Sequence, residues 1–123
     1  VRPLDDYELA ARLSYFLWSS CPDPALAAAA ADGSLGTPAG LARQVERLLA
    51  DPKAARFTDN FAGQWLGLRQ LDATTPDSRL YPEYDDLLHQ SVGRETRLFF
   101  AELVAKDLGV RNLIDSDWAM LNG

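Results

Sequence analysis

The stretch DDYELAARLSYFLWSSCPD, residues 5–23, decides the fold class of this 123-residue chain. Its large apolar residues recur at spacings of three and four, the pattern of one face of an α-helix: Leu9, Leu13, Phe16 and Leu17. Asp5 and Glu8 stand three positions apart before this pattern, so each side chain can bind a free backbone N–H of the first turn as a capping box. The stretch therefore predicts a helix that is capped at Asp5.

Three later positions repeat one helix-starting device, a short polar residue followed by proline. They are Asp23-Pro24, Thr37-Pro38 and Asp51-Pro52. The polar side chain can cap the helix, and proline fits the first helical position because its missing N–H has no partner there. The second helix is expected to span roughly Pro24 to Ala31, and the third and fourth are expected to follow the other two starts.

The later helices also show apolar faces. The expected inward residues of the third helix are Leu41, Val45, Leu48 and Leu49. Those of the fourth are Phe57, Phe61, Trp65 and Leu68, and Gly63 and Gly67 leave a shallow place where another helix could approach. A fifth helix is expected from about Asp85 to Asp107, and its inward residues are Leu88, Val92, Thr96, Phe99 and Leu103. Asp117 is a candidate cap for a last helix.

No segment alternates apolar and polar residues with period two, so strands are not expected. The fold class predicted is all-α, an irregular bundle of five to six helices with no sheet. Residues 1–123 are expected to form a single helical domain. The first residue is not Met, and the final DWAMLNG reads as the opening of a new segment. We therefore expect a fragment excised from a larger multi-domain protein.

Composition excludes several classes of partner. Twelve basic and eighteen acidic side chains give a net charge of −6, which repels nucleic-acid phosphates and anionic lipid. No apolar run is long enough to span a bilayer, so membrane insertion is not expected. No nucleic-acid partner is expected either. The sequence instead predicts neighbouring domains of the parent protein as partners.

The residue types that carry catalysis are sparse. The chain has one histidine, His89, and one cysteine, Cys21, so a zinc site with nitrogen and sulfur ligands is not expected. Covalent haem attachment, phosphate loops, nucleophile elbows and HExxH motifs have no counterpart in the sequence. Cys21 follows a helix end without a basic neighbour in sequence, and we interpret it as a thiol that fills space. The sequence predicts no catalytic, cofactor-binding or metal-binding residue, and it leans against an enzyme for this segment alone.

Four polar residues stand on or beside apolar faces. Arg12 lies between Leu9 and Phe16, and Glu95 has the same relation to its own helix. Asn60 and Gln64 border the aromatic face of the fourth helix. A buried charge is costly unless it is paired, so we predict that Arg12 and Glu95 meet, or that each finds another buried partner. The alternative is that the carboxylate lines a functional pocket.

Several aromatic residues fall outside the predicted core faces: Trp18, Tyr81, Tyr84 and Trp118. A cluster of exposed apolar residues can mark a partner surface. Trp118, Met120 and Leu121 belong to the final segment, and we predict that they form a docking edge toward the rest of the parent protein.

Five motifs carry a resemblance to a known family. In chain order they are LDDYELAARLSYFLWSSCPD, RLLADPKA, NFAGQWLGLRQLD, RETRLFF and DSDWAMLNG. From about Leu4 to Asn122 the chain resembles domain-of-unknown-function family 1592 of planctomycete-type, cytochrome-c-associated multi-domain proteins. The resemblance implies an extracytoplasmic setting, periplasmic or secreted, and a neighbouring c-type cytochrome module that would carry haem. It implies no established activity.

Three hypotheses follow from these observations. The leading one is a non-catalytic helical structural or interaction module of an exported, cytochrome-associated protein. The alternative is one wall of an oxidoreductase active site that neighbouring domains complete. A third reading is a carbohydrate-binding module built on the exposed aromatic residues.

Overall fold

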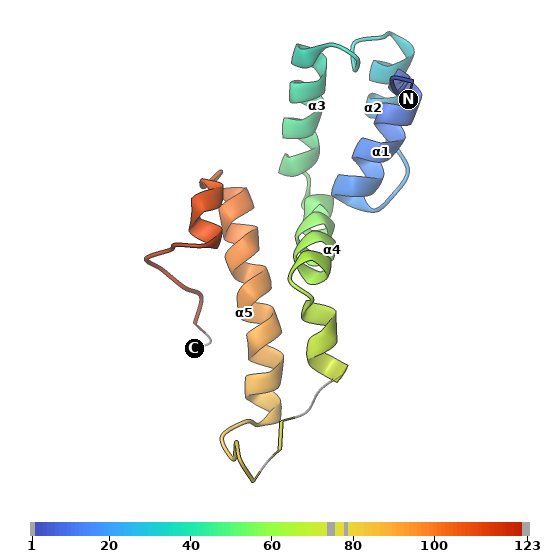
Figure 1. The fold of residues 1–123 in the computed structure, drawn as a ribbon. Coiled ribbons are helices and arrows are strands. Elements are labelled where there is room, and N and C mark those ends of the chain that lie inside the picture. The colour runs from blue at the N-terminus through green and yellow to red at the C-terminus, as the bar shows by residue number, and fades with distance from the viewer. Residues whose placement is uncertain (1, 74–75, 78, 122–123) are drawn as a thin grey trace. The chain divides into compact units, whose positions relative to one another are not determined.

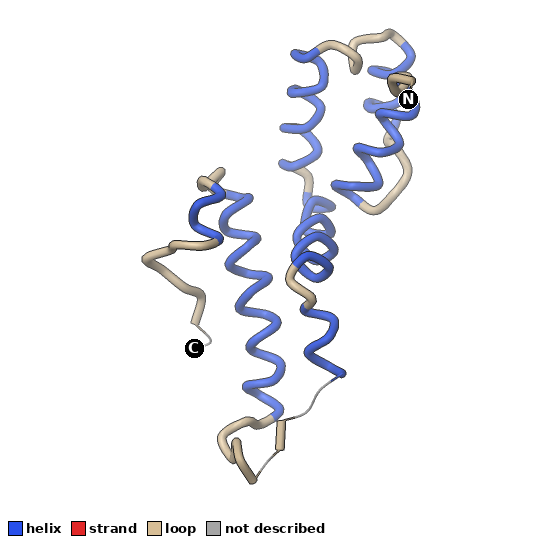
Figure 2. The backbone as a smooth tube through the Cα atoms, in the orientation of Figure 1, coloured by secondary structure: helices blue, strands red, loops and turns tan. Residues whose placement is uncertain are grey.

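The computed structural model describes residues 2–73, 76–77 and 79–121. Helices are the only regular structure in these residues, with five α-helices and three short 3-10 segments (Figure 1, Figure 2). The all-α fold class is therefore confirmed. The backbone divides into two compact units, Val1–Phe57 and Thr58–Gly123, which we call the N-terminal and C-terminal units. The single domain expected over residues 1–123 stays a prediction.

The N-terminal unit begins with α1 (Asp6–Trp18), α2 (Pro24–Ala31) and α3 (Pro38–Ala50). The capping box at α1 is confirmed, because the Asp5 carboxylate accepts from the Glu8 N–H at 2.8 Å and the Glu8 carboxylate accepts from the Asp5 N–H at 3.0 Å.

The first two of the three proline starts, Asp23-Pro24 and Thr37-Pro38, are confirmed as well. Asp23 accepts from the N–H of Leu26 at 2.9 Å, and Thr37 accepts from the N–H of Gly40 at 3.1 Å. The third proline start differs from the expectation, because Asp51 caps the 3-10 segment η1 (Pro52–Ala54) rather than the fourth helix directly.

Trp18 is the centre of the core of the N-terminal unit. Its side chain is only 1% exposed, and its indole N–H donates to the Leu48 carbonyl at 2.8 Å. The Lys53 ammonium lies 4.5 Å from the ring centroid, where a cation is attracted by the aromatic face. The remaining members of the core are Ala10, Leu17, Leu26, Ala29, Ala30, Leu35 and Leu48. The sequence-based placement of Trp18 among exposed aromatics is wrong.

The buried face of α1 explains that error. Its buried positions are Ala10, Ser14, Leu17 and Trp18. Of the residues expected to face inward, Leu17 is buried and Phe16 is exposed. Small side chains at the contact let neighbouring helices approach closely, so the contact centres on Ala10 and Ser14, while Leu9 and Leu13 pack against its edge.

Cys21 lies at the surface rather than in a packed position. Its sulfur is 3.2 Å from the Tyr15 hydroxyl, and this hydrogen bond raises the pKa of Tyr15. The prediction that Cys21 fills space at the helix end is therefore wrong.

The fourth helix, α4 (Ala55–Trp65), starts in the N-terminal unit and continues into the C-terminal unit. The 3-10 segment η2 (Leu68–Ala73) follows it. Between them Gly67 has a φ of +65°, a left-handed conformation that L side chains rarely adopt. Gly67 therefore ends a helix, and it does not form part of a helix-packing face with Gly63 as the sequence suggested.

The C-terminal unit is completed by α5 (Asp86–Ala105) and η3 (Val110–Leu113). The expected fifth helix is confirmed, and Asp85 caps it by accepting from the N–H of Leu88 at 2.7 Å. No helix follows Asp117 within the described residues. The segment instead runs back beside α5, where the ring of Trp118 stacks on Phe99 with centroids 4.4 Å apart (Figure 1).

Candidate functional site

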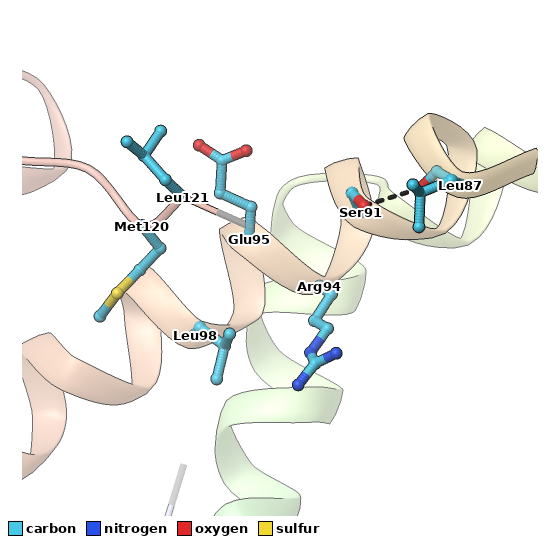
Figure 3. A pocket seen from close by; sticks show the side chains of 7 residues that line it. All are labelled: Leu87, Ser91, Arg94, Glu95, Leu98, Met120 and Leu121. Atoms are coloured by element: carbon cyan, nitrogen blue, oxygen red, sulfur yellow. Dashed lines mark hydrogen bonds between the residues drawn. The ribbon is translucent and has the colours of Figure 1, made fainter. Parts of the chain in front are cut away.

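A pocket of about 250 Å³ lies between α5 and the segment that follows η3 (Figure 3). Its lining residues are Leu87, Ser91, Arg94, Glu95, Leu98, Met120 and Leu121. All of them belong to the C-terminal unit, so the pocket is a property of that unit alone. Four of the seven side chains are large and apolar.

One face of α5 forms the first wall of the pocket. The spacings from Leu87 to Ser91, Glu95 and Leu98 are four, four and three residues, which places these positions above one another on a helix. The Ser91 hydroxyl donates to the Leu87 carbonyl at 2.6 Å. The positions of this wall are therefore fixed by the backbone of one helix.

The second wall consists of Met120 and Leu121. The Phe99–Trp118 stack holds the chain two residues earlier against α5, and the Ser116 hydroxyl donates to the Trp118 carbonyl at 3.0 Å. These contacts place the methionine and leucine opposite the helical wall (Figure 3).

The two charged residues of the pocket point to different sides. In Figure 3 the Glu95 carboxylate lies on the side of Leu121, and the Arg94 guanidinium points to the opposite side, where Leu98 lies. Glu95 is partly buried and Arg94 is exposed. Within the described residues of the C-terminal unit, neither forms an ion pair or hydrogen bond. The pocket therefore presents the Glu95 carboxylate as an acceptor, while the Arg94 guanidinium points away from that side.

The four residues of the predicted buried polar network occupy different surroundings. Arg12 is exposed on α1, and Gln64 is exposed on α4. Asn60 is partly buried, and its side-chain oxygen accepts from the Arg69 guanidinium at 3.3 Å. Glu95 lines the pocket. A pair between Arg12 and Glu95 would join the two units and stays a prediction.

The predicted docking edge is divided between two roles. Trp118 packs on Phe99, whereas Met120 and Leu121 form a wall of the pocket. Sequence reasoning missed four lining residues, because it placed the inward face of α5 one residue away, at Leu88 and its helical neighbours. The four are Leu87, Ser91, Arg94 and Leu98. Their spacing is that of a helix, but it does not show that another segment covers this face.

The same unit exposes further apolar surface around η3. Val110 is 81% exposed and Ile114 is 93% exposed. Acidic residues stand nearby in the chain, and Asp115 forms an exposed ion pair with Arg111 at 3.2 Å. The C-terminal unit contains eleven acidic and six basic residues, while the N-terminal unit contains seven and six. Most of the net negative charge of the chain therefore belongs to the C-terminal unit.

The described residues offer poor ligands for metals or haem. They contain no group of three or more metal-binding side chains. His89 uses its Nδ1 in a 2.9 Å hydrogen bond with the Tyr84 hydroxyl. A haem needs axial His, Met or Cys ligands, and at the pocket only Met120 is of these types. The pocket is also smaller than the roughly 300–1,000 Å³ typical of sites for larger ligands, so it does not fit a haem.

Among the described helices, none combines the length and the apolar character that crossing a membrane requires.

The chain was compared with known families and proteins. A model of the family described as "Protein of unknown function (DUF1592)", also named PSD4, matches residues 4–123. Neither a curated protein nor a solved structure matches the chain. The family match covers nearly the whole sequence and agrees with the motifs that carry the resemblance. The chain therefore belongs to the DUF1592 family.

Proposed function

We propose that this chain is a non-catalytic helical interaction module that docks onto a neighbouring domain of its parent protein through the C-terminal unit. The observation that carries the proposal is the exposure of Val110, the first residue of η3, and of Ile114, the residue after it. Large apolar side chains that gather at the surface can mark protein–protein contacts. The described residues also lack the convergent reactive groups that an active site needs.

The charge of the unit indicates the chemistry of the partner. The C-terminal unit, which carries the exposed apolar residues, has five more acidic than basic side chains. Complementary potentials favour association and suppress contacts with like-charged surfaces. The partner surface is therefore expected to have an apolar centre with a basic rim. The c-type cytochrome module implied by the family resemblance is the neighbouring domain to which we assign this surface, and that module would carry the haem.

The setting we propose is extracytoplasmic, in the periplasm or outside the cell. The support for this setting is the resemblance to planctomycete-type exported proteins. Fractionation of cells that produce the parent protein, followed by detection with an antibody against residues 1–123, tests it. Recovery of the parent protein in the cytoplasmic fraction would contradict an exported module.

Docking can be measured with separately produced proteins. The chain and the cytochrome domain of its parent protein are mixed, and sedimentation velocity is followed at the haem absorbance. We expect a complex that weakens at least tenfold in Val110→Ser/Ile114→Ser, because buried apolar anchors dominate binding energy. Leu4→Ser, an exposed leucine of the N-terminal unit, is the matched control and is expected to leave binding unchanged. Absence of a complex at 100-fold excess of either protein, or equal loss in both variants, would contradict the proposal.

A second candidate function is one wall of an oxidoreductase active site that neighbouring domains complete. The observation that favours it is the Glu95 carboxylate, which lines an open pocket. Glu95→Gln in the intact parent protein would then lower turnover without weakening domain association. An unchanged turnover in that variant would contradict this candidate.

The carbohydrate-binding hypothesis loses its support at one of the two tryptophans that it invoked. Trp18 is buried in the core of the N-terminal unit, so it offers no open aromatic face for stacking on a sugar ring. Trp118 is partly exposed and packs on Phe99. We therefore favour the interaction module over a carbohydrate-binding module.

A further inference from the structure

We propose that the pocket on α5 receives a basic side chain of the docking partner, an arginine or a lysine. This inference rests on the proposed interaction function and names the chemistry of one contact within it. The apolar stem of the incoming side chain would pack against Leu98, Met120 and Leu121, and its cationic group would bind the Glu95 carboxylate.

The size of the pocket suits a single side chain. Its volume of about 250 Å³ lies below the range of sites that enclose a drug-sized ligand. Protein interfaces, by contrast, are dominated by a few anchor residues that insert into small pockets, and arginine is enriched among these anchors. The pocket therefore has the dimensions of an anchor site.

The lining matches the two halves of a basic side chain. Lysine and arginine bury their aliphatic stems along apolar surface while the charged group stays hydrated or paired. Met120 adapts well to such stems, because its unbranched thioether chain is flexible and polarizable. An ionised carboxylate accepts hydrogen bonds only, and it can bind a guanidinium through two parallel bonds. Glu95 supplies that acceptor at the edge of the apolar wall (Figure 3).

The arrangement of charge favours a cation over an anion. Arg94 could in principle attract a carboxylate, but its guanidinium is exposed and points away from the Glu95 side (Figure 3). The more buried charge is the carboxylate, and a partly desolvated carboxylate without a partner gains more from pairing than an exposed guanidinium does. The excess of acidic residues in the C-terminal unit also repels anions.

Small probes of equal length and opposite charge test this assignment in the chain of residues 1–123. Hexylguanidinium, hexanoate and 1-hexanol are titrated separately while methyl signals are followed by NMR. We expect hexylguanidinium to shift the signals of Leu98 and Met120, with an affinity on the order of millimolar for so few atoms. It should bind about threefold more tightly than 1-hexanol, the effect expected of a partly exposed ion pair. Hexanoate should bind most weakly.

Two adjacent variants identify the group that is responsible. Glu95→Gln keeps the size of the side chain and is expected to abolish the preference for hexylguanidinium over 1-hexanol. Arg94→Gln is the matched control, and it should preserve or strengthen that preference. The indole N–H signal of Trp118, whose ring packs on Phe99 in the same unit, reports whether each variant remains folded.

Three results would overturn the inference. They are tighter binding of hexanoate than of hexylguanidinium, absence of shifts at Leu98 and Met120 for every probe, and an unchanged preference in Glu95→Gln. The docking proposal has a separate readout, because sedimentation with the cytochrome domain depends on Val110 and Ile114. If the probes fail to bind as expected but docking is intact, the basic anchor is rejected and the proposed interaction module stands. If docking is not observed but the probes bind as expected, the cytochrome domain is rejected as the partner and the preference of the pocket for a basic group stands.

Discussion

The two units of this chain differ in how much of their apolar surface is buried. The N-terminal unit buries seven apolar residues in one cluster with Trp18, and its acidic and basic residues are nearly balanced in number. The C-terminal unit buries few large apolar side chains, among them Leu68, Phe100 and Leu103. It contains twelve of the seventeen exposed large hydrophobic residues in the described part of the chain, together with most of the negative charge.

This difference indicates that the N-terminal unit is stabilised by its own core, whereas the C-terminal unit has surface that a partner can bury. In the N-terminal unit the polar groups support the core, because Asp23 both caps α2 and binds the Arg47 guanidinium through two hydrogen bonds of 2.7 and 2.9 Å. In the pocket of the C-terminal unit, Arg94 and Glu95 have no such partners among the described residues of that unit. Exposed apolar side chains and unpaired charges in the C-terminal unit indicate a binding surface. Buried apolar side chains and paired charges in the N-terminal unit indicate a contribution to stability.

The largest expected effect comes from removing the indole at the centre of the first core. Trp18→Ala should destabilise the N-terminal unit by about 3–5 kcal/mol, because it leaves a cavity and deprives the Leu48 carbonyl of its donor. Denaturant unfolding followed by circular dichroism measures the loss. Hydrogen exchange of peptides from each unit shows where it occurs.

Trp65→Ala is the matched variant in the C-terminal unit. Trp65 is 56% exposed and contacts Phe61 with ring centroids 5.8 Å apart. We expect a loss of about 1 kcal/mol or less, the value of one aromatic pair. Equal losses from both tryptophan variants would mean that the contrast between the units is incorrect.

Two glycines allow a second comparison between the units. A Cβ on Gly40, in the first turn of α3, would lie 1.9 Å from the Ser34 carbonyl oxygen, so the backbone must shift. Gly40→Ala should therefore cost about 1–3 kcal/mol, as overpacking does. A Cβ on Gly63, in α4, would meet nothing within 4 Å. Gly63→Ala should stabilise by about 1 kcal/mol through helix propensity. Thermal unfolding of both variants gives the sign of each change in stability. A change of the same sign in both variants would contradict the packing described.

The Asp23–Arg47 pair makes the stability of the N-terminal unit depend on pH. The hydrogen bonds from Arg47 hold the pKa of Asp23 below its usual value of about 3.9. The stabilisation is therefore complete above that value and is lost as pH falls through the lowered pKa of the folded chain. Asn at position 23 can still cap α2 but cannot form the ion pair.

Denaturant unfolding of the wild type and of Asp23→Asn between pH 6 and pH 2 measures this contribution. We expect the wild type to lose about 1 kcal/mol more than the variant over this range. Asp32 and Asp77 also have lowered pKa values, but they are present in both proteins, so their contributions cancel. Parallel pH profiles would show that the pair contributes no stability.

Sequence predicted helix starts well because a cap is local chemistry. Asp5, Asp23, Thr37 and Asp85 all accept hydrogen bonds from backbone N–H groups within three residues. Each cap requires only neighbours in the chain, so its pattern is complete in the sequence.

Sequence predicted buried faces less well because burial depends on distant segments. On α5 the expected inward residues included Leu88 and Val92, whereas the buried positions include Ser91 and Gly93. On α1 the corresponding shift placed Trp18 inside. Large side chains dominate a hydrophobic pattern, but small residues often occupy the centre of a close helix contact. The pocket escaped prediction for the same reason, since it exists only where residues 120–121 return to α5.

The smallest expected effect on stability is also the sharpest test of the exposed surface. Ile114 is 93% exposed, so Ile114→Ser removes almost no buried area and should change the free energy of unfolding by less than about 0.5 kcal/mol. Thermal unfolding of the chain alone measures this change, and Leu103→Ser, at a buried position of α5, is the control that should cost several kcal/mol. A large loss from Ile114→Ser would show that this side chain supports the fold of the C-terminal unit. A negligible loss leaves its apolar surface available for binding, because a residue that contributes nothing to folding can be buried by a partner without cost to the fold.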